Sequence, residues 1–148
     1  MKRKPSIPWE DTEVSTEKSL SQIRALLSRY GCDKWSFPEE AAGDISIFFS
    51  YKGQPVNIDL HARKMYRRLV ELHPRSERDR LLEQARRITA RQAYHYLKVT
   101  FEVIETGLFS PVEALLAHMV TPDGRRISDF IMELQPNLSR LLSSPEDK

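Results

Sequence analysis

Residues 76–107 read SERDRLLEQARRITARQAYHYLKVTFEVIETG, and this stretch decides the fold. Ser76 is a good N-cap residue, and nothing interrupts the helical pattern before Gly107. The pattern predicts one helix of roughly 30 residues, about 45 Å long, which is more than a domain of this size needs, so we expect one end to project or bend. Its second half should be buried, because apolar side chains share one face there: Tyr94, Leu97, Phe101 and Ile104, with Val99 and Val103 nearby.

A shorter helix and three strand candidates precede this long helix. Residues 15–30 have helical periodicity, and Gly31 stands where a left-handed C-terminal cap is expected. Residues 34–37, 44–51 and 55–60 alternate with a period of two, and Lys52-Gly53 predicts a tight turn between the last two. We therefore expect an α+β fold, in which a small three-stranded antiparallel sheet packs against helices that include one long central helix.

The remaining segments complete one domain. Residues 62–72 predict a short basic helix, Ser110-Pro111 opens another with a capping box, and Ser128 is the expected cap of a helix over residues 129–134. The tail from Pro136 is expected to pack through Leu138, Leu141 and Leu142. We expect a flexible basic arm over residues 1–14 that docks through Trp9, a single α+β domain over residues 15–142, and a disordered tail over residues 143–148.

Composition excludes several classes of protein. The chain has 148 residues, of which 40% are hydrophobic and 30% charged. Its mean hydropathy is −0.51. No segment reaches the roughly 18 apolar residues that a membrane span needs, and the N-terminus lacks the apolar core of a signal peptide. A single cysteine, Cys32, excludes an internal disulfide and any multi-cysteine metal site. We therefore expect a cytoplasmic protein without a membrane partner.

The charge is unevenly distributed along the chain. The net charge of the whole chain is +2, but residues 61–100 carry eleven basic and four acidic side chains, which is +7 and leaves −5 for the rest. On the long helix the spacing predicts one stripe, made by Arg80, Arg87, Arg91 and Lys98 with Gln84 and His95 in the gaps. The short basic helix adds Arg63, Lys64, Arg67 and Arg68.

Two interpretations of this charge remain open. Such a stripe suits a phosphate backbone, because each neutralised phosphate releases counterions and adds affinity. The alternative is a solvated helix face on which Glu83 pairs with Arg87 and Lys98 pairs with Glu102. An acidic protein partner is a third possibility. Adjacent Phe48 and Phe49 point to opposite faces of their strand, so one of them is either a stacking platform for a base or covered by a second layer.

Support for catalysis is thin. The histidines are far apart, there is no glycine-rich phosphate loop, and Cys32 follows a helix end that disfavours a thiolate. One arrangement remains, in which Asp44 and the Asp59-Leu60-His61 run reach the same sheet edge and hold a divalent metal for nuclease chemistry. We expect no enzyme, cofactor or metal, and keep the metal-dependent nuclease as a third hypothesis.

Several runs together resemble a family of uncharacterised small proteins encoded in phage and prophage genomes. The matching runs are Tyr30-Gly31-Cys32-Asp33, Glu83-Gln84-Ala85-Arg86-Arg87, and residues 98–107, 109–119 and 120–124. The resemblance covers most of residues 16–135. It implies a role in phage DNA metabolism or in interference with host defence, and it brings no activity with it.

The sequence therefore predicts a non-enzymatic, phage-type accessory protein that binds nucleic acid through a basic helical surface, mainly by phosphate contacts. The alternative is a protein-interaction module, acting as an inhibitor, a regulator or a subunit of a larger assembly such as a nucleoprotein. A homo-oligomer is compatible with both hypotheses.

Overall fold

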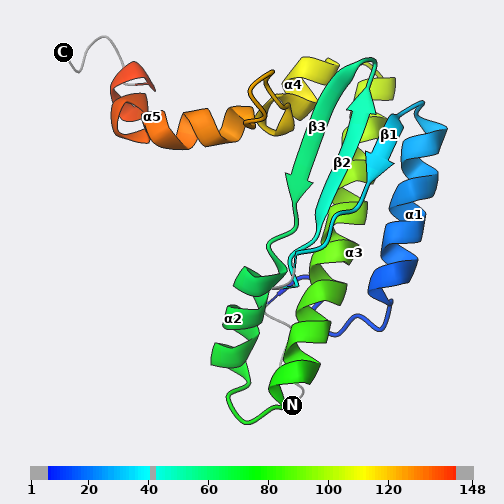
Figure 1. Ribbon diagram of the computed structural model, residues 1–148, viewed down its shortest axis with the longest axis vertical. Coiled ribbons are helices and arrows are strands. Elements are labelled where there is room, and N and C mark those ends of the chain that lie inside the picture. Colours follow the sequence, from blue (N-terminus) through cyan, green and yellow to red (C-terminus); the bar gives the residue numbers. More distant parts are fainter. Residues whose placement is uncertain (1–6, 41–42, 143–148) are drawn as a thin grey trace.

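The computed structural model describes residues 7–40 and 43–142, and it has the expected α+β architecture. A three-stranded antiparallel sheet of order β1-β2-β3 is covered on one face by α1 and α3 (Figure 1). The elements are α1 Thr16–Arg29, β1 Asp33–Ser36, β2 Ser46–Tyr51, β3 Gln54–Asp59, α2 Ala62–Leu72, α3 Arg78–Glu105, α4 Pro111–Leu115, the 3-10 helix η1 Leu116–His118 and α5 Ile127–Leu142.

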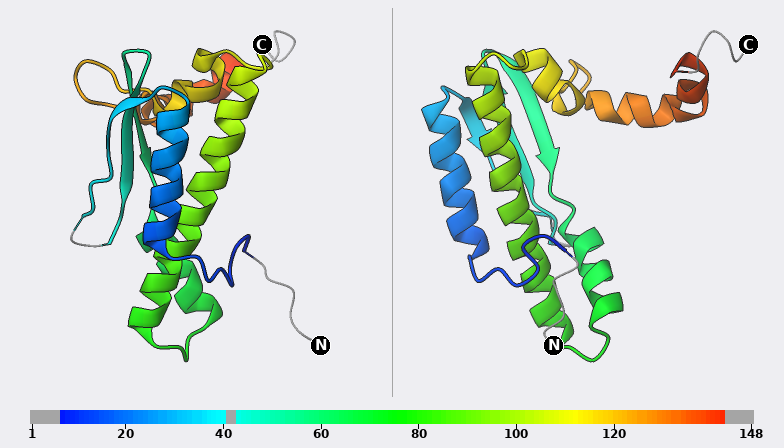
Figure 2. Two further views of the ribbon diagram at one scale, coloured as in Figure 1. Left: turned by 90° about the vertical axis from the view of Figure 1, so that its right-hand side faces the viewer. Right: turned by 180° about the vertical axis from the view of Figure 1, so that it is seen from behind.

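The sheet has one apolar face, as the alternating pattern predicts. Tyr51 pairs with Gln54 across the Lys52-Gly53 turn, and Gly53 adopts the positive φ of 81° that this turn requires. Ile47 and Phe49 of β2 are fully buried on the face that the helices cover; α1 and α3 lie beside the sheet in the left view of Figure 2 and in front of it in the right view. Phe48 points to the opposite face and is half-buried. The sheet and the two helices thus enclose the main hydrophobic cluster.

Phe101 of α3 lies at the centre of the main cluster. Its ring stacks on Tyr30 at a centroid distance of 4.9 Å and meets Phe49 and Tyr51 at 6.1 and 5.9 Å. Leu97 is also fully buried, so the second half of α3 is the core element that its pattern predicts. Val99 is the exception, since it is 56% exposed on the outer side of the helix.

The first half of α3 packs against α2 in a second hydrophobic cluster. This cluster contains Leu69 of α2, Leu81, Ala85 and Ile88 of α3, and Ile7 from the segment before α1. The surplus length of α3 extends past the sheet to form this pair (Figure 1). The expectation of a projecting end therefore needs a correction, because α2 covers that end.

Helix ends follow the sequence at most positions. Ser15 caps α1, and Ser110 and Glu113 form the expected capping box of α4. The prediction for Ser76 was wrong, because α3 begins at Arg78 and its N-cap, Glu77, makes no side-chain cap. Without a side-chain bond to hold it, the helix start depends on packing against α2.

The last helix differs most from expectation. It begins at Ile127, before the expected cap Ser128, and continues through Pro136 to Leu142. Leu142 is 75% exposed, so the expected packing of the tail is wrong at that residue; the side chains of Leu138 and Leu141 lie outside the described residues. In Figure 1, α5 leaves the body of the molecule and changes direction in its second half, which contains the helix-disrupting Pro136.

Candidate nucleic-acid interface

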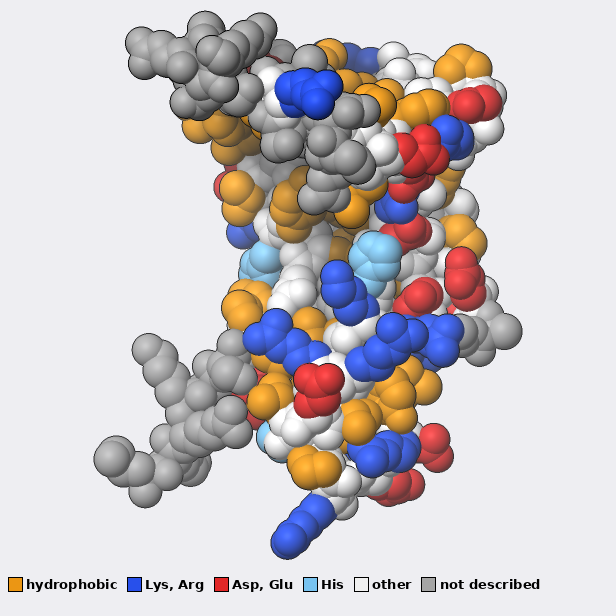
Figure 3. Space-filling model, turned by 90° about the vertical axis from the view of Figure 1, so that its left-hand side faces the viewer, with side chains coloured by type: hydrophobic (Ala, Val, Ile, Leu, Met, Phe, Trp, Pro, Cys, Tyr) orange, Lys and Arg blue, Asp and Glu red, His pale blue; other side chains and the backbone are white. Residues whose placement is uncertain are grey.

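Helix α2 presents a strongly basic outer face. Leu69 is buried against α3, and Ala62, on the same side of the helix, is also buried, which turns the opposite side of the helix to solvent. Four basic side chains lie exposed on that side, and we call them the α2 basic face: Arg63, Lys64, Arg67 and Arg68. Figure 3 shows Lys and Arg side chains gathered over this lower part of the molecule. Among the described contacts, none of the four forms an ion pair.

The start of α2 is held firmly relative to the sheet. His61 precedes the helix in a left-handed conformation, with φ 52°. The Asp44 carboxylate, just before β2, accepts a hydrogen bond of 2.8 Å from the backbone N–H of Arg63. This bond satisfies one of the free N–H groups of the first turn and places a negative charge where the helix dipole favours it. The α2 basic face is therefore presented at a defined orientation.

The basic stripe expected on α3 is not one continuous surface. Arg91 is only 6% exposed, donates a hydrogen bond from Nη2 to Gln22 Oε1 of α1, and places its guanidinium 4.6 Å from the ring centre of Tyr94. Burial between α1 and α3 removes Arg91 from the surface. Lys98, two turns further on, is exposed but separated from the other stripe residues.

Arg80 and Arg87 line a hollow of about 380 Å³ beside α2. Arg87 Nη2 lies 3.0 Å from Glu83 Oε1, so this pair has the contact that the solvated-face alternative predicts. Within the described part of the chain, Lys98 does not form the corresponding pair with Glu102. Of the eight predicted site residues, the structure thus brings six to the α2 end of the molecule and leaves Arg91 and Lys98 apart.

Residues 7–14, which we call the strap, cover the middle of the stripe that was expected on α3. Gln84 donates from Nε2 to the carbonyl oxygens of Glu10 and Thr12, at 2.9 and 3.0 Å. Gln92 donates to the carbonyl of Pro8 at 3.1 Å. Gln84, which fills a gap in the expected stripe, and the nearby Gln92 therefore hold a chain segment against α3. Residues 1–6 of the expected basic arm lie outside the described residues.

Two side chains of the strap pack against the helices. Ile7 is 3% exposed in the second cluster. The Trp9 ring stacks on His95 with centroids 4.4 Å apart and planes 3° from parallel. Burial lowers the pKa of His95, as do Arg91 and Lys98, which favours the neutral form of the ring beneath Trp9. The sequence predicted only the docking of Trp9. Ile7 and Trp9 are two large apolar side chains in a segment without periodicity, and this was the signal that the whole segment packs on the helices.

Exposed and half-buried aromatic side chains, which could stack on a base, have contacts within the protein. The Arg24 guanidinium lies 5.2 Å from the ring centre of Trp35 and 5.3 Å from that of Phe37. Tyr96 is 45% exposed and its hydroxyl lies 2.9 Å from His118 Nε2. Phe48, half-buried on the outer face of the sheet, is the one candidate from β2 that faces away from the helices.

The residues of the nuclease hypothesis have structural partners. Asp44 caps α2, while Asp59 accepts a hydrogen bond of 2.6 Å from Ser46 Oγ and pairs with Arg126 at 2.9 Å. In the described ranges, no three His, Cys, Asp or Glu side chains are grouped so as to hold a metal ion. Burial and the nearby Asp33 raise the pKa of the Cys32 thiol to about 11, so this cysteine is protonated at neutral pH.

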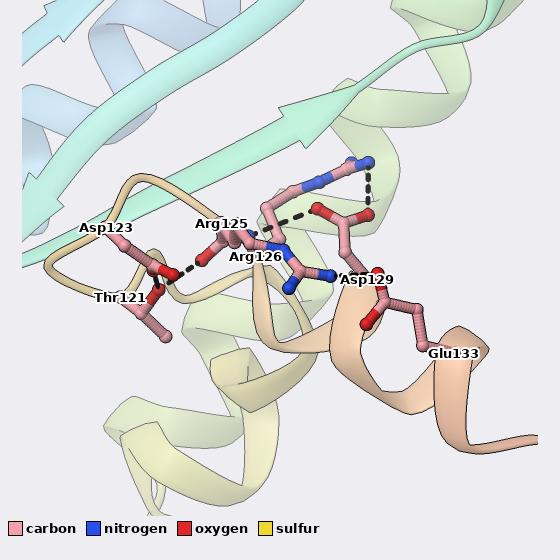
Figure 4. Close-up of polar contacts among 6 residues, drawn as sticks. All are labelled: Thr121, Asp123, Arg125, Arg126, Asp129 and Glu133. Atoms are coloured by element: carbon pink, nitrogen blue, oxygen red, sulfur yellow. Dashed lines mark hydrogen bonds and ion pairs between the residues drawn. The ribbon is translucent and has the colours of Figure 1, made fainter.

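Arg126 also joins the body of the protein to α5. Its guanidinium contacts Asp129 in the first turn of α5, and the neighbouring Arg125 pairs with Glu133 one turn further on (Figure 4). The turn before them is closed by Thr121, whose hydroxyl contacts Asp123 and the carbonyl of Arg125. Polar contacts thus fix the start of α5, whereas Met132 and Leu134 are exposed at 66% and 52%.

No family model, curated protein or solved structure matches this chain. None of the described helices has both the length and the apolar character that crossing a bilayer requires. The α2 basic face is therefore the feature of the molecule that bears on its function.

Proposed function

We propose that this protein is a non-enzymatic accessory protein, of the phage type that its sequence resembles, and that it binds nucleic acid through the α2 basic face. One observation carries the proposal. Arg63, Lys64, Arg67 and Arg68 are all exposed on one side of one helix, and no carboxylate of the described residues pairs with them. An unpaired cluster of this kind retains its full charge for phosphate groups.

The geometry favours phosphate contacts over base recognition. Residues four apart on a helix are separated by about 6 Å along the axis, so Arg63 and Arg67 form one row and Lys64 and Arg68 a second. Arginine guanidinium groups form bidentate bonds with phosphate oxygens. Contacts of this class position a nucleic acid without reading its sequence, and we expect low sequence specificity.

The test is a titration of mixed-sequence single-stranded and double-stranded DNA and RNA, followed by fluorescence anisotropy at about 50 mM salt. We expect Arg67→Glu/Arg68→Glu to weaken binding at least tenfold, and each lost phosphate contact to flatten the slope of log affinity against log salt by about 0.9. The matched control is Lys18→Glu/Lys34→Glu, which makes the same charge change at two exposed residues on other elements. Equal loss in both variants, or no binding by the wild type, would refute the proposal.

A second candidate function, a protein-interaction module, is favoured by the C-terminal third. Eight of the eleven exposed large apolar side chains in the described residues lie between Leu108 and Leu142. They belong to α5 and to the segment around α4, so two copies of the chain could cover both groups reciprocally across a twofold axis. Light scattering across a concentration series tests this: a dimer is expected, and Met132→Glu/Leu134→Glu should dissociate it. A wild-type monomer at every concentration would exclude self-association.

A further inference from the structure

The strap places carboxylates next to arginines that a nucleic acid would otherwise reach. Glu10, Asp11 and Glu13 line the same hollow as Arg80 and Arg87. We propose that the strap is a built-in competitor: it shields the α3 part of the polyanion site, and nucleic acid bound to the α2 basic face displaces it. This inference rests on the proposed function, and it adds a second, latent half to the site.

The strap is held by contacts that leave its charges largely free. Gln84 and Gln92 are uncharged, and they bond to backbone carbonyls at Pro8, Glu10 and Thr12. Among the strap carboxylates, Glu10 alone has a side-chain partner: its Oε1 lies 3.4 Å from Nε2 of His73, the C-cap of α2. Asp11 and Glu13 are exposed, without a partner among the described residues. The strap thus has an anchored backbone and an acidic outer edge.

That acidic edge opposes a phosphate in the hollow. With the strap in place, Arg80 and Arg87 share the hollow with Glu83 and three strap carboxylates, so the local charge is unfavourable for an anion. Without the strap, the two arginines face Glu83 alone. The repulsion between the strap carboxylates and an anion is electrostatic. The difference in anion affinity between the covered and the uncovered hollow should therefore be largest at low salt.

The uncovered arginines would extend the α2 basic face. Arg80 and Arg87 lie two turns apart, about 10 Å along the axis of α3. The hollow that they line also includes Leu69 and His73, which belong to α2 and its C-cap. The hollow lies beside the buried side of α2, so a nucleic acid on the α2 basic face reaches Arg80 and Arg87 by passing around the helix, and there the strap carboxylates repel its phosphates.

The strap is attached by few contacts, so a ligand can displace it. It has no helix or strand of its own, and it is attached through one buried side chain, Ile7, one stacked ring, Trp9, three hydrogen bonds from Gln84 and Gln92, and the contact between Glu10 and His73. Such a segment opens at lower free energy than the core elements. Displacement therefore leaves α1, the sheet and the main cluster in place.

Neutralising the strap tests the competition directly. In Glu10→Gln/Asp11→Asn/Glu13→Gln the shape and the backbone anchors are kept, and we expect about tenfold tighter binding of a mixed-sequence 20-nucleotide DNA at about 50 mM salt. Adding Arg80→Gln/Arg87→Gln should abolish that gain. The control Glu40→Gln/Glu102→Gln/Glu105→Gln removes the same number of carboxylates from exposed positions elsewhere in the chain and should gain much less.

Tryptophan fluorescence reports the displacement itself. The chain has two tryptophans, so Trp35→Phe leaves Trp9 as the sole reporter. We expect the DNA to raise acrylamide quenching of Trp9 as its ring leaves His95, and Arg67→Glu/Arg68→Glu to prevent the change. If the neutral strap and the wild type bind equally and Trp9 quenching stays constant, the competitor role is wrong while the α2 site stands. If neither protein binds DNA, the proposed function itself fails.

Discussion

Arg91 is a buried cation with few partners. It has one side-chain hydrogen bond, to Gln22, and a place over the Tyr94 ring, while its Nε has no acceptor among the described atoms. Removing an arginine from water costs free energy that one neutral acceptor offsets only in part. Arg91 is therefore expected to contribute to the packing of α1 on α3 and not to ligand binding.

Substitution Arg91→Met tests this assignment. Methionine fills similar space without a charge, so we expect an unchanged or higher melting temperature and an unchanged salt slope in DNA binding. Arg67→Met, on the α2 basic face, should flatten the slope by about 0.9. A flatter salt slope for Arg91→Met would show that Arg91 does contact the nucleic acid.

His118 predicts a pH dependence of stability. Burial and the nearby Arg126 lower its pKa below the ordinary value of 6.5. The unfolded state then binds the proton more readily, so the stabilisation is complete above about pH 6.5 and is lost as the pH falls through the folded-state pKa. Thermal melts from pH 7.5 to 5 should show a smaller decrease for His118→Gln than for the wild type. Parallel curves would contradict this role.

Residue-level predictions succeeded where the cause is local. Gly31 and Ser110 act within one helical turn, and both occupy the expected capping positions. Arg91 could not be predicted, because its spacing is the same as that of the exposed arginines on α3. Whether a charged residue in a stripe is exposed depends on the element that packs against it, here α1.

Helix α2 shows what an element's own sequence can determine. Its bounds, Ala62–Leu72, are those expected, because Pro74 limits the helix and the alternation of apolar and basic residues defines both faces. Helix α5 shows the opposite case. Pro136 predicted an end, yet the helix continues to Leu142, since proline bends a helix without always ending it.

Helix α5 should contribute little to the stability of the monomer. None of its described side chains belongs to either hydrophobic cluster, and polar pairs attach its first turns. We expect a chain that ends at Ser128 to lose less than about 4 °C in melting temperature, since about 1 kcal/mol corresponds to a few degrees at this size. A loss above about 10 °C would show that α5 packs on the core in solution.

Across the whole molecule, α3 connects two hydrophobic clusters. The main cluster was predictable from the apolar face around Leu97 and Phe101. The second cluster was not, because Ile7 lies in a segment without periodicity and nothing local indicates where such a segment docks. The same limit applied to the site: its basic residues could be found from the sequence, but their cover by the strap could not.

The two clusters should respond separately to substitution. Leu69 is 1% exposed, and Leu69→Ala should cost about 2 kcal/mol or more through the cavity that it leaves. We expect hydrogen exchange to accelerate in α2 and the first turns of α3, while the amides of β2 keep their protection. Leu97→Ala, in the main cluster, should accelerate exchange in β2 as well. Uniform acceleration in Leu69→Ala would mean that the clusters unfold as one unit.

The short connection between α2 and α3 also bears on the order of folding. Residues 73–77 join two helices that pack together, whereas the contact between Gln22 and Arg91 joins residues 69 apart in sequence. Closing the shorter loop costs less chain entropy, so this helical hairpin should form early in the folding transition. Stopped-flow kinetics should find that Leu69→Ala mainly slows refolding, while Leu27→Ala mainly speeds unfolding; the reverse would place the sheet first. If this hairpin forms first, α2 and its basic face reach their native structure before the sheet does.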